Sequence, residues 1–149
     1  MIYSNKVTKY IKWLDPEEMH EASKNWNSEL SFIGDEQLFL EELVNTYTLQ
    51  LTEISKFNEN MKLIDTLGTL QKQHEELTKK VKDHMNGLEI LVDGVDQLDK
   101  EAEYKNEHKA LLKLLPEYVA AYRLLKTELF QVFKTILKDE KQKHLIRNK

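Results

Sequence analysis

The segment KLIDTLGTLQKQHEELTKKVKDHMNGLEILVDGVDQLD, residues 62–99, carries the strongest structural signal of the chain. Its apolar residues recur at alternating steps of four and three positions, and the positions between them are mostly Lys, Glu, Gln and Asp. Such coiled-coil-like heptad spacing puts one row of side chains, here called the seam, along one side of an α-helix. The segment is therefore predicted to be one helix, with the seam Leu63, Leu67, Leu70, His74, Leu77, Val81, His84, Leu88, Leu91, Val95 and Leu98.

The same spacing follows this segment and predicts another helix over about residues 102–141. Pro116 lies inside it, where a proline removes one backbone hydrogen bond, so we expect a kink there rather than a loop. The seam keeps its phase across the proline: Tyr104, His108, Leu111, Leu115, Tyr118, Tyr122, Leu125, Leu129, Val132 and Ile136.

A third run of the same spacing precedes residue 62 and predicts a helix over about residues 16–61. Asp15, Pro16 and Glu18 form a helix-start pattern, with Asp15 as the N-cap. Gly34 could divide this helix, although the phase continues across it. The seam here is Met19, Ser23, Trp26, Leu30, Ile33, Gln37, Leu40, Val44, Tyr47, Leu51, Ile54, Asn58 and Met61.

Three rods of similar length joined by short polar connections fold back on one another. The predicted fold is therefore all-α: one domain over residues 1–149, an elongated antiparallel bundle of three long helices. A break at Gly34 would give a four-helix bundle instead. Residues 1–14 are left as a short turn or a loose arm. Gly87 and Gly94 lie seven residues apart, and we expect them to permit close approach of the first helix.

Composition excludes several classes of function. The chain has 149 residues, a net charge of −4 and no cysteine, so disulfides and thiolate chemistry are excluded. The Lys-rich tail is interpreted as a solvated helix end rather than a nucleic-acid footprint. No apolar run approaches the ~20 residues of a membrane helix, and the first 15 residues lack a signal core. We expect a soluble, cytoplasmic protein that binds neither nucleic acid nor a membrane.

Three histidines, His74, His84 and His108, occupy seam positions where Leu is the usual residue. Together with Tyr118 they are the candidate buried polar residues. They could form a ligand site, a pH switch or a proton relay, but single polar seam residues more often fix register. With the turn placed near residue 101, His84 is expected level with Tyr118 and His108 level with Gly94. On this geometry the three histidines cannot meet at one site, so we expect a structural role for each.

Neither a metal centre nor a catalytic site is predicted. Di-metal bundles need two Glu-x-x-His motifs, and Glu17-x-x-His20 is the single instance. Nucleophile elbows and Gly-rich phosphate loops are absent from the sequence. We therefore expect no metal, no cofactor and no enzymatic activity.

Apolar residues outside the seam suggest a surface for another protein. On the first helix these are Phe32, Leu38 and Phe39, and on the last helix Leu124. Phe130 and Leu137 also lie off the seam and are expected to widen the core. The favoured function is a non-enzymatic interaction or scaffolding module that binds another protein or itself, possibly as a homodimer. The alternative is a small-molecule or metal-binding bundle that uses the seam histidines.

Overall fold

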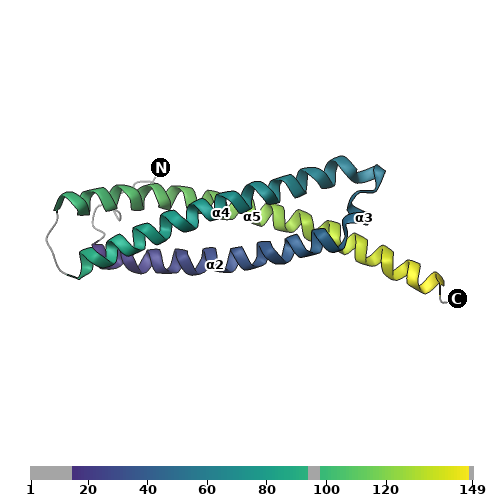
Figure 1. The fold of residues 1–149 in the computed structure, drawn as a ribbon, viewed down its shortest axis with the longest axis horizontal. Coiled ribbons are helices and arrows are strands. Elements are labelled where there is room, and N and C mark those ends of the chain that lie inside the picture. Colours follow the sequence, from purple (N-terminus) through teal and green to yellow (C-terminus); the bar gives the residue numbers. More distant parts are fainter. Residues whose placement is uncertain (1–14, 94–97, 148–149) are drawn as a thin grey trace, which may run out of the picture. The chain divides into compact units, whose positions relative to one another are not determined.

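The computed structural model describes residues 15–93 and 98–147, and in these residues every regular element is a helix. The fold is an all-α helical bundle (Figure 1). Its elements in chain order are α2 (Pro16–Thr46), α3 (Thr48–Leu51), the 3₁₀ helix η1 (Ile54–Lys56), α4 (Phe57–Val92) and α5 (Leu98–Arg147). The expectation for residues 1–14 lies outside the described residues.

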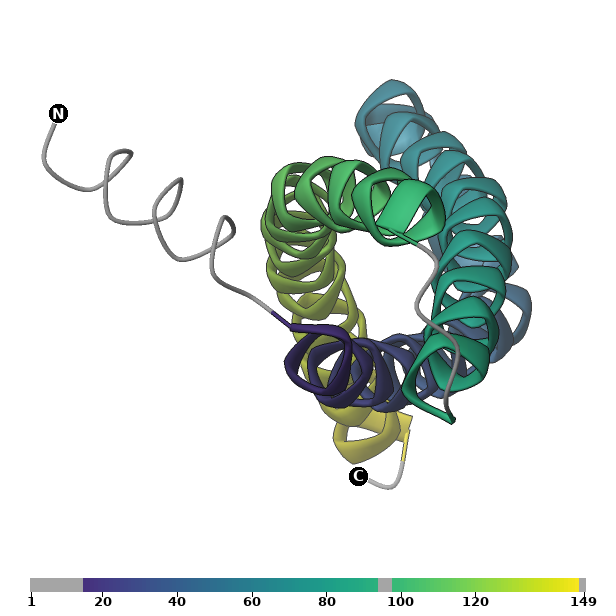
Figure 2. The same ribbon diagram turned by 90° about the vertical axis from the view of Figure 1, so that its left-hand side faces the viewer.

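The described residues form two compact units, to each of which α2, α4 and α5 contribute one part. Unit 1 contains α2 up to Phe32 together with His74–Glu117. In unit 1 these three segments surround a common axis (Figure 2). Its core includes Met19 of α2 against Leu88 of α4, with Leu91, Tyr104 and Leu112 packed around them. Unit 2 contains Ile33–Gln73 and Tyr118–Lys149.

The predicted seam is the buried face of α2, of α4 from Leu63 onward and of α5, which confirms the heptad assignment there; it fails at the start of α4, where Asn58 is exposed and Asn60 is buried instead. Its described members in α4, from Leu63 to Leu91, are all buried or half-buried, and the charged positions between them lie mostly in solvent. The start of α2 is also as predicted, because the Glu18 amide donates to Asp15 Oδ1 at 2.8 Å. Burial of one apolar row per helix thus supplies the driving force for the bundle.

The first predicted helix, residues 16–61, is wrong in its second half. It continues through Gly34 but ends at Thr46, and the chain reverses through α3 and η1 before α4 begins at Phe57. The hydroxyls of Thr46, Thr48 and Thr52 in this reversal each donate to backbone carbonyls three or four residues earlier. The described residues therefore contain four α-helices, divided near Tyr47 rather than at Gly34.

The seam phase concealed this turn because Leu51 is buried within it. The side chain of Asn60, itself buried, donates to the Leu51 carbonyl at 2.9 Å and so satisfies an acceptor at the end of α3. A residue can therefore occupy a predicted seam position and be buried although it belongs to the short helix α3 and not to the long helix that was predicted.

The second connection was also placed too late in the sequence. The prediction put it at residues 99–102, whereas α4 ends at Val92 and α5 begins at Leu98. Asp93-Gly94 is a typical turn dipeptide, but the seam spacing continues across it, so the periodicity does not mark the end of the helix. The third helix is longer than predicted: α5 continues through the exposed Pro116 to Arg147.

Among the described helices, none combines the length and the apolar composition that a membrane crossing requires.

Gly87 allows a close approach, although of a different helix from the one expected. A Cβ atom placed on Gly87 would lie 2.6 Å from two ring carbons of Tyr104, which belongs to α5 rather than to the first helix. Gly94, the other glycine of that expectation, lies outside the described residues. The absence of a side chain at Gly87 thus lets the Tyr104 ring pack against α4.

We predict that Gly87→Ala lowers the free energy of unfolding. The gain of ~1 kcal/mol in helix propensity is outweighed because the Tyr104 ring must leave its position, and overpacking costs about 1–3 kcal/mol. Gly68→Ala is the matched control in the same helix, since a Cβ there meets nothing within 4 Å. Thermal unfolding should show a lower melting temperature for Gly87→Ala and a higher one for Gly68→Ala; equal rises would refute the close contact.

Candidate functional site

The core of unit 1 contains a hydrogen-bonded chain of three titratable side chains. His84 of α4 lies with its Nε2 atom 3.0 Å from Nδ1 of His108 on α5. Its other ring nitrogen, Nδ1, lies 3.1 Å from Oε2 of Glu107, also on α5. The chain therefore runs from Glu107 through His84 to His108.

The carboxylate fixes the position of each proton in the neutral pair. Because an ionised carboxylate only accepts hydrogen bonds, His84 Nδ1 carries a proton and donates it to Glu107. In a neutral His84 the Nε2 atom is then an acceptor, so His108 Nδ1 donates to it. The Nε2 atom of a neutral His108 keeps its lone pair.

Trp26 brings α2 into the same layer. Its indole stacks on the His108 ring, with 4.5 Å between ring centroids and 26° between planes. His84 and His108 are 2% and 1% exposed, whereas the Glu107 side chain is 49% exposed. The layer thus joins all three helices of unit 1 and reaches solvent at the carboxylate.

Burial makes both imidazoles hard to charge. It lowers the pKa of His84 from 6.5, and the hydrogen bond and charge of Glu107 oppose that effect. Burial, and secondarily the charge of His84, lowers the pKa of His108 to about 4. Both histidines are consequently neutral at pH 7.

A surface pocket of about 480 Å³ adjoins this layer. Its wall is apolar on the side of Ala110, Leu111 and Leu114 and polar elsewhere, where it is lined by Lys80, Asp83, His84, Tyr104 and Glu107. Both ring nitrogens of His84 are already hydrogen-bonded, so His84 offers a ligand little beyond its ring face.

As predicted, the three seam histidines do not meet at one site, but His84 and His108 do contact each other, so their predicted levels were wrong. Because α4 ends at Val92 and α5 begins at Leu98, earlier than predicted, the partner of His84 is His108 rather than Tyr118. His74 lies apart from the pair: it is half-buried, and its Nε2 hydrogen-bonds the carbonyl of Leu30. The four candidate buried polar residues therefore do not form one site: His84 and His108 form a pair, and His74 and Tyr118 each make other contacts.

No three His, Cys, Asp or Glu side chains within residues 15–93 and 98–147 are grouped so that they could hold a metal ion. In the histidine pair, the two facing nitrogens are hydrogen-bonded to each other.

Tyr118, the fourth candidate buried polar residue, forms a corresponding layer in unit 2. Its hydroxyl donates to the carbonyl of Leu70 on α4 at 3.0 Å and accepts from Gln37 Nε2 on α2 at 2.7 Å. Both Tyr118 and Gln37 are buried. Burial raises the pKa of Tyr118, so the phenol stays protonated and keeps its donor role.

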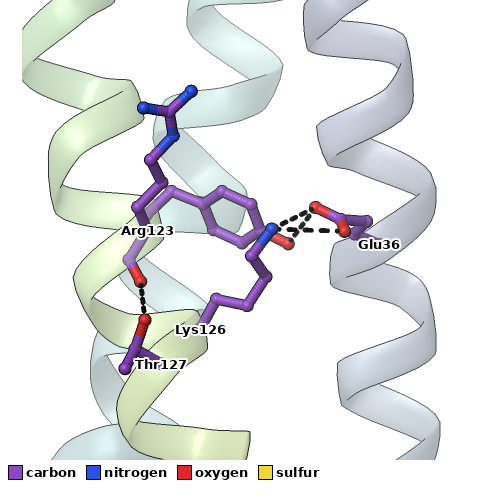
Figure 3. Close-up of polar contacts among 5 residues, drawn as sticks. Glu36, Arg123, Lys126 and Thr127 are labelled. Atoms are coloured by element: carbon purple, nitrogen blue, oxygen red, sulfur yellow. Dashed lines mark hydrogen bonds and ion pairs between the residues drawn. The ribbon is translucent and has the colours of Figure 1, made fainter.

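A second polar contact of unit 2 lies one turn further along α5. Glu36 of α2 pairs with Lys126 of α5 at 3.2 Å (Figure 3). The Tyr122 hydroxyl also donates to Glu36, at 3.0 Å. Burial, followed by the hydrogen bond and charge of Glu36, raises the pKa of Tyr122. These residues are more exposed at their charged ends than the Tyr118 layer.

The candidate interaction residues are all exposed. Phe32, Leu38, Phe39 and Leu124 each have more than half of their surface in solvent. Phe32 belongs to unit 1 and the other three to unit 2. Phe130 and Leu137 do not widen the core as expected, because they are 41% and 51% exposed.

Sequence reasoning missed the partners rather than the buried polar residues themselves. Gln37 was recognisable as a polar seam residue, and Trp26 as a seam aromatic. No sequence pattern marks Glu107 as a site residue, apart from its place beside His108, because it lies on the exposed flank of α5. Pairing these residues required the correct turn position.

Comparisons with known proteins give no relative from which a function could be transferred: no family model, curated protein or solved structure matches the chain.

We predict that Tyr118→Phe destabilises the protein by about 1–3 kcal/mol, because it leaves the buried Gln37 amide without its hydrogen-bond partner. Tyr122→Phe, one turn away on α5, is the matched control and should cost less, since Glu36 keeps Lys126 and contact with solvent. Urea unfolding of both variants measures the difference. Equal losses of unfolding free energy would show that the hydrogen bonds of Tyr118 contribute no more to stability than that of Tyr122.

Proposed function

We propose that this chain is a non-enzymatic interaction module that associates with a second copy of itself through two helix faces of unit 2. The observation that carries the proposal is a pair of exposed faces with opposite charge on α2 and α5. Each face has apolar side chains at helical spacing with charges of one sign beside them.

The α2 face consists of Asp35, Leu38, Phe39 and Glu42, which follow the i, i+3, i+4, i+7 spacing of one helix side. All four are exposed. The sequence contains no Lys or Arg between Lys24 and Lys56, so this side of α2 is acidic. Two large apolar side chains between two acidic ones form a surface on which a helix with apolar and basic side chains can dock.

The α5 face consists of Phe130, Lys134, Leu137 and Lys141, which also share one side of their helix and are all exposed. It therefore has the features that the α2 face would bind: apolar side chains alternating with basic ones. Within the described residues, the two acids of the α2 face and the two lysines of the α5 face form no ion pair. Their charges remain available to a partner.

A second copy is the occupant favoured by this complementarity, because one chain carries both faces. If α2 of each copy packs on α5 of the other, a two-fold axis closes the assembly as a dimer. Each face has only four side chains, which is small beside the ~800 Å² per partner of a standard interface. We therefore expect weak, concentration-dependent association.

The alternative function, small-molecule binding at the seam histidines, has less support. The pocket beside His84 has a suitable size, but the ring nitrogens of His84 are occupied by Glu107 and His108. A ligand would have to break one of these bonds before using the imidazole.

We predict that Phe39→Ser weakens self-association about tenfold, the effect of losing a central aromatic contact of roughly 1.4 kcal/mol. Sedimentation over a concentration series measures the change, and circular dichroism should show unchanged helicity. Ile90→Ser is the control, since Ile90 is an exposed apolar residue of α4 outside both faces. A parent chain that stays monomeric at every concentration, with a Phe39→Ser variant that unfolds, would assign the ring to the core.

Charge exchange tests whether the partner is a second copy. Glu42→Lys and Lys134→Glu should each weaken association, because like charges then face each other. An equimolar mixture of the two variants should associate again, since each contact then joins opposite charges. Loss of association without recovery on mixing would refute the pairing of α2 with α5, and rescue only by another protein would replace the second copy as the partner.

A further inference from the structure

We propose that the Glu107–His84–His108 chain makes unit 1 an acid-sensitive switch, which holds one added proton while packed and opens when it takes a second. The inference rests on contacts of unit 1 and is independent of the proposed self-association, which uses faces of unit 2.

The first proton fits the packed arrangement. A charged His84 donates from both ring nitrogens, so its Nδ1 keeps the bond to Glu107 and its Nε2 donates to His108. His108 then accepts at Nδ1 and carries its own proton at Nε2. Both hydrogen bonds survive, and the new positive charge lies beside the Glu107 carboxylate.

The second proton does not fit. A charged His108 has N–H groups at both ring nitrogens, so its Nδ1–H would face the Nε2–H of a charged His84 across 3.0 Å. Two donors at that distance lose their hydrogen bond, and two like charges lie in a buried site. The Trp26 ring stacked on His108 leaves the imidazolium without water on that face. Relief requires the helices of unit 1 to separate.

Charged groups around the pair act mainly on the first proton. On α4, Lys80 and Asp83 line the pocket beside His84, but the charge that acts on the His84 pKa is that of Glu107. On α5, Tyr104 lies 6.0 Å from the His84 ring, and Glu107 bonds to His84 directly. α2 contributes the neutral ring of Trp26. The direct carboxylate partner therefore belongs to His84, and His108 is the residue whose charge the packed unit rejects.

The direction of the pH effect follows from the folded pKa values, which burial holds below 6.5 for both histidines. The unfolded chain binds protons first as the pH falls, so stability is complete above about 6.5 and declines below it. The decline continues to the folded pKa of His108, about 4. The unfolding constant should rise by up to about tenfold per pH unit for each histidine.

The experiment uses the full chain with Trp13→Phe, so that Trp26 is its one tryptophan. Trp26 fluorescence and the imidazole NMR signals are followed between pH 7.5 and 4. We expect the His84 imidazole to titrate while the Trp26 signal stays native. The His108 imidazole should titrate together with the change in the Trp26 signal. Two charged imidazoles beside a native Trp26 signal would overturn the proposal.

Variants separate the switch from a merely structural role. His84→Leu with His108→Leu should remove the acid transition at Trp26, whereas His20→Gln, a histidine outside the pair, should leave it in place. Glu107→Gln keeps the pair and withdraws the charge that favours the first proton. It should therefore move the transition to higher pH, and it remains informative if the double variant fails to fold. Equal destabilisation by Glu107→Gln at pH 7.5 and pH 5 would refute the switch.

Discussion

Register is the constraint on which the structure depends, and the hydrogen bond between His84 and His108 shows how it is set. A Leu-rich seam that repeats every seven residues packs almost as well after a slide of one heptad, about 10.5 Å along the helix. A buried imidazole cannot slide in this way, because each lost hydrogen bond leaves a polar group unsatisfied. The α4–α5 pairing in unit 1 is therefore fixed by polar groups, although apolar burial drives its formation.

The two units use the same device with different chemistry. In unit 2 the Tyr118 hydroxyl joins Gln37 of α2 to the Leu70 carbonyl of α4, and its raised pKa keeps it a neutral donor at acid and neutral pH. In unit 1 the corresponding layer consists of imidazoles, whose protonation lies within the accessible pH range. One bundle thus combines a layer that is insensitive to acid with one that acid can disrupt.

The exposed apolar residues of the α2 and α5 faces are not explained by core packing. Phe39 and Leu38 are exposed although the seam beside them is filled, so core formation does not require them. On α2 they stand between Asp35 and Glu42, and on α5 Phe130 and Leu137 alternate with Lys134 and Lys141. An exposed apolar group with uniform charge around it limits the partners that can bind, because like-charged surfaces are rejected. This patterning is the reason for proposing self-association rather than indiscriminate binding.

The sequence by itself determined the helical class, the buried face of each helix and the start of α2 at Asp15. These properties depend on local periodicity and on short-range capping, both of which are readable within a few turns. It did not determine where the helices end, because the seam spacing of the sequence continues past the ends of α2 at Thr46 and of α4 at Val92. Only the tertiary structure decided that His84 meets His108, since an error in the position of the α4–α5 connection moves the predicted partner by twice that error. Glu107 and Trp26 joined the site for the same reason: their roles depend on which turns of neighbouring helices lie level, and that is a property of the packed chain.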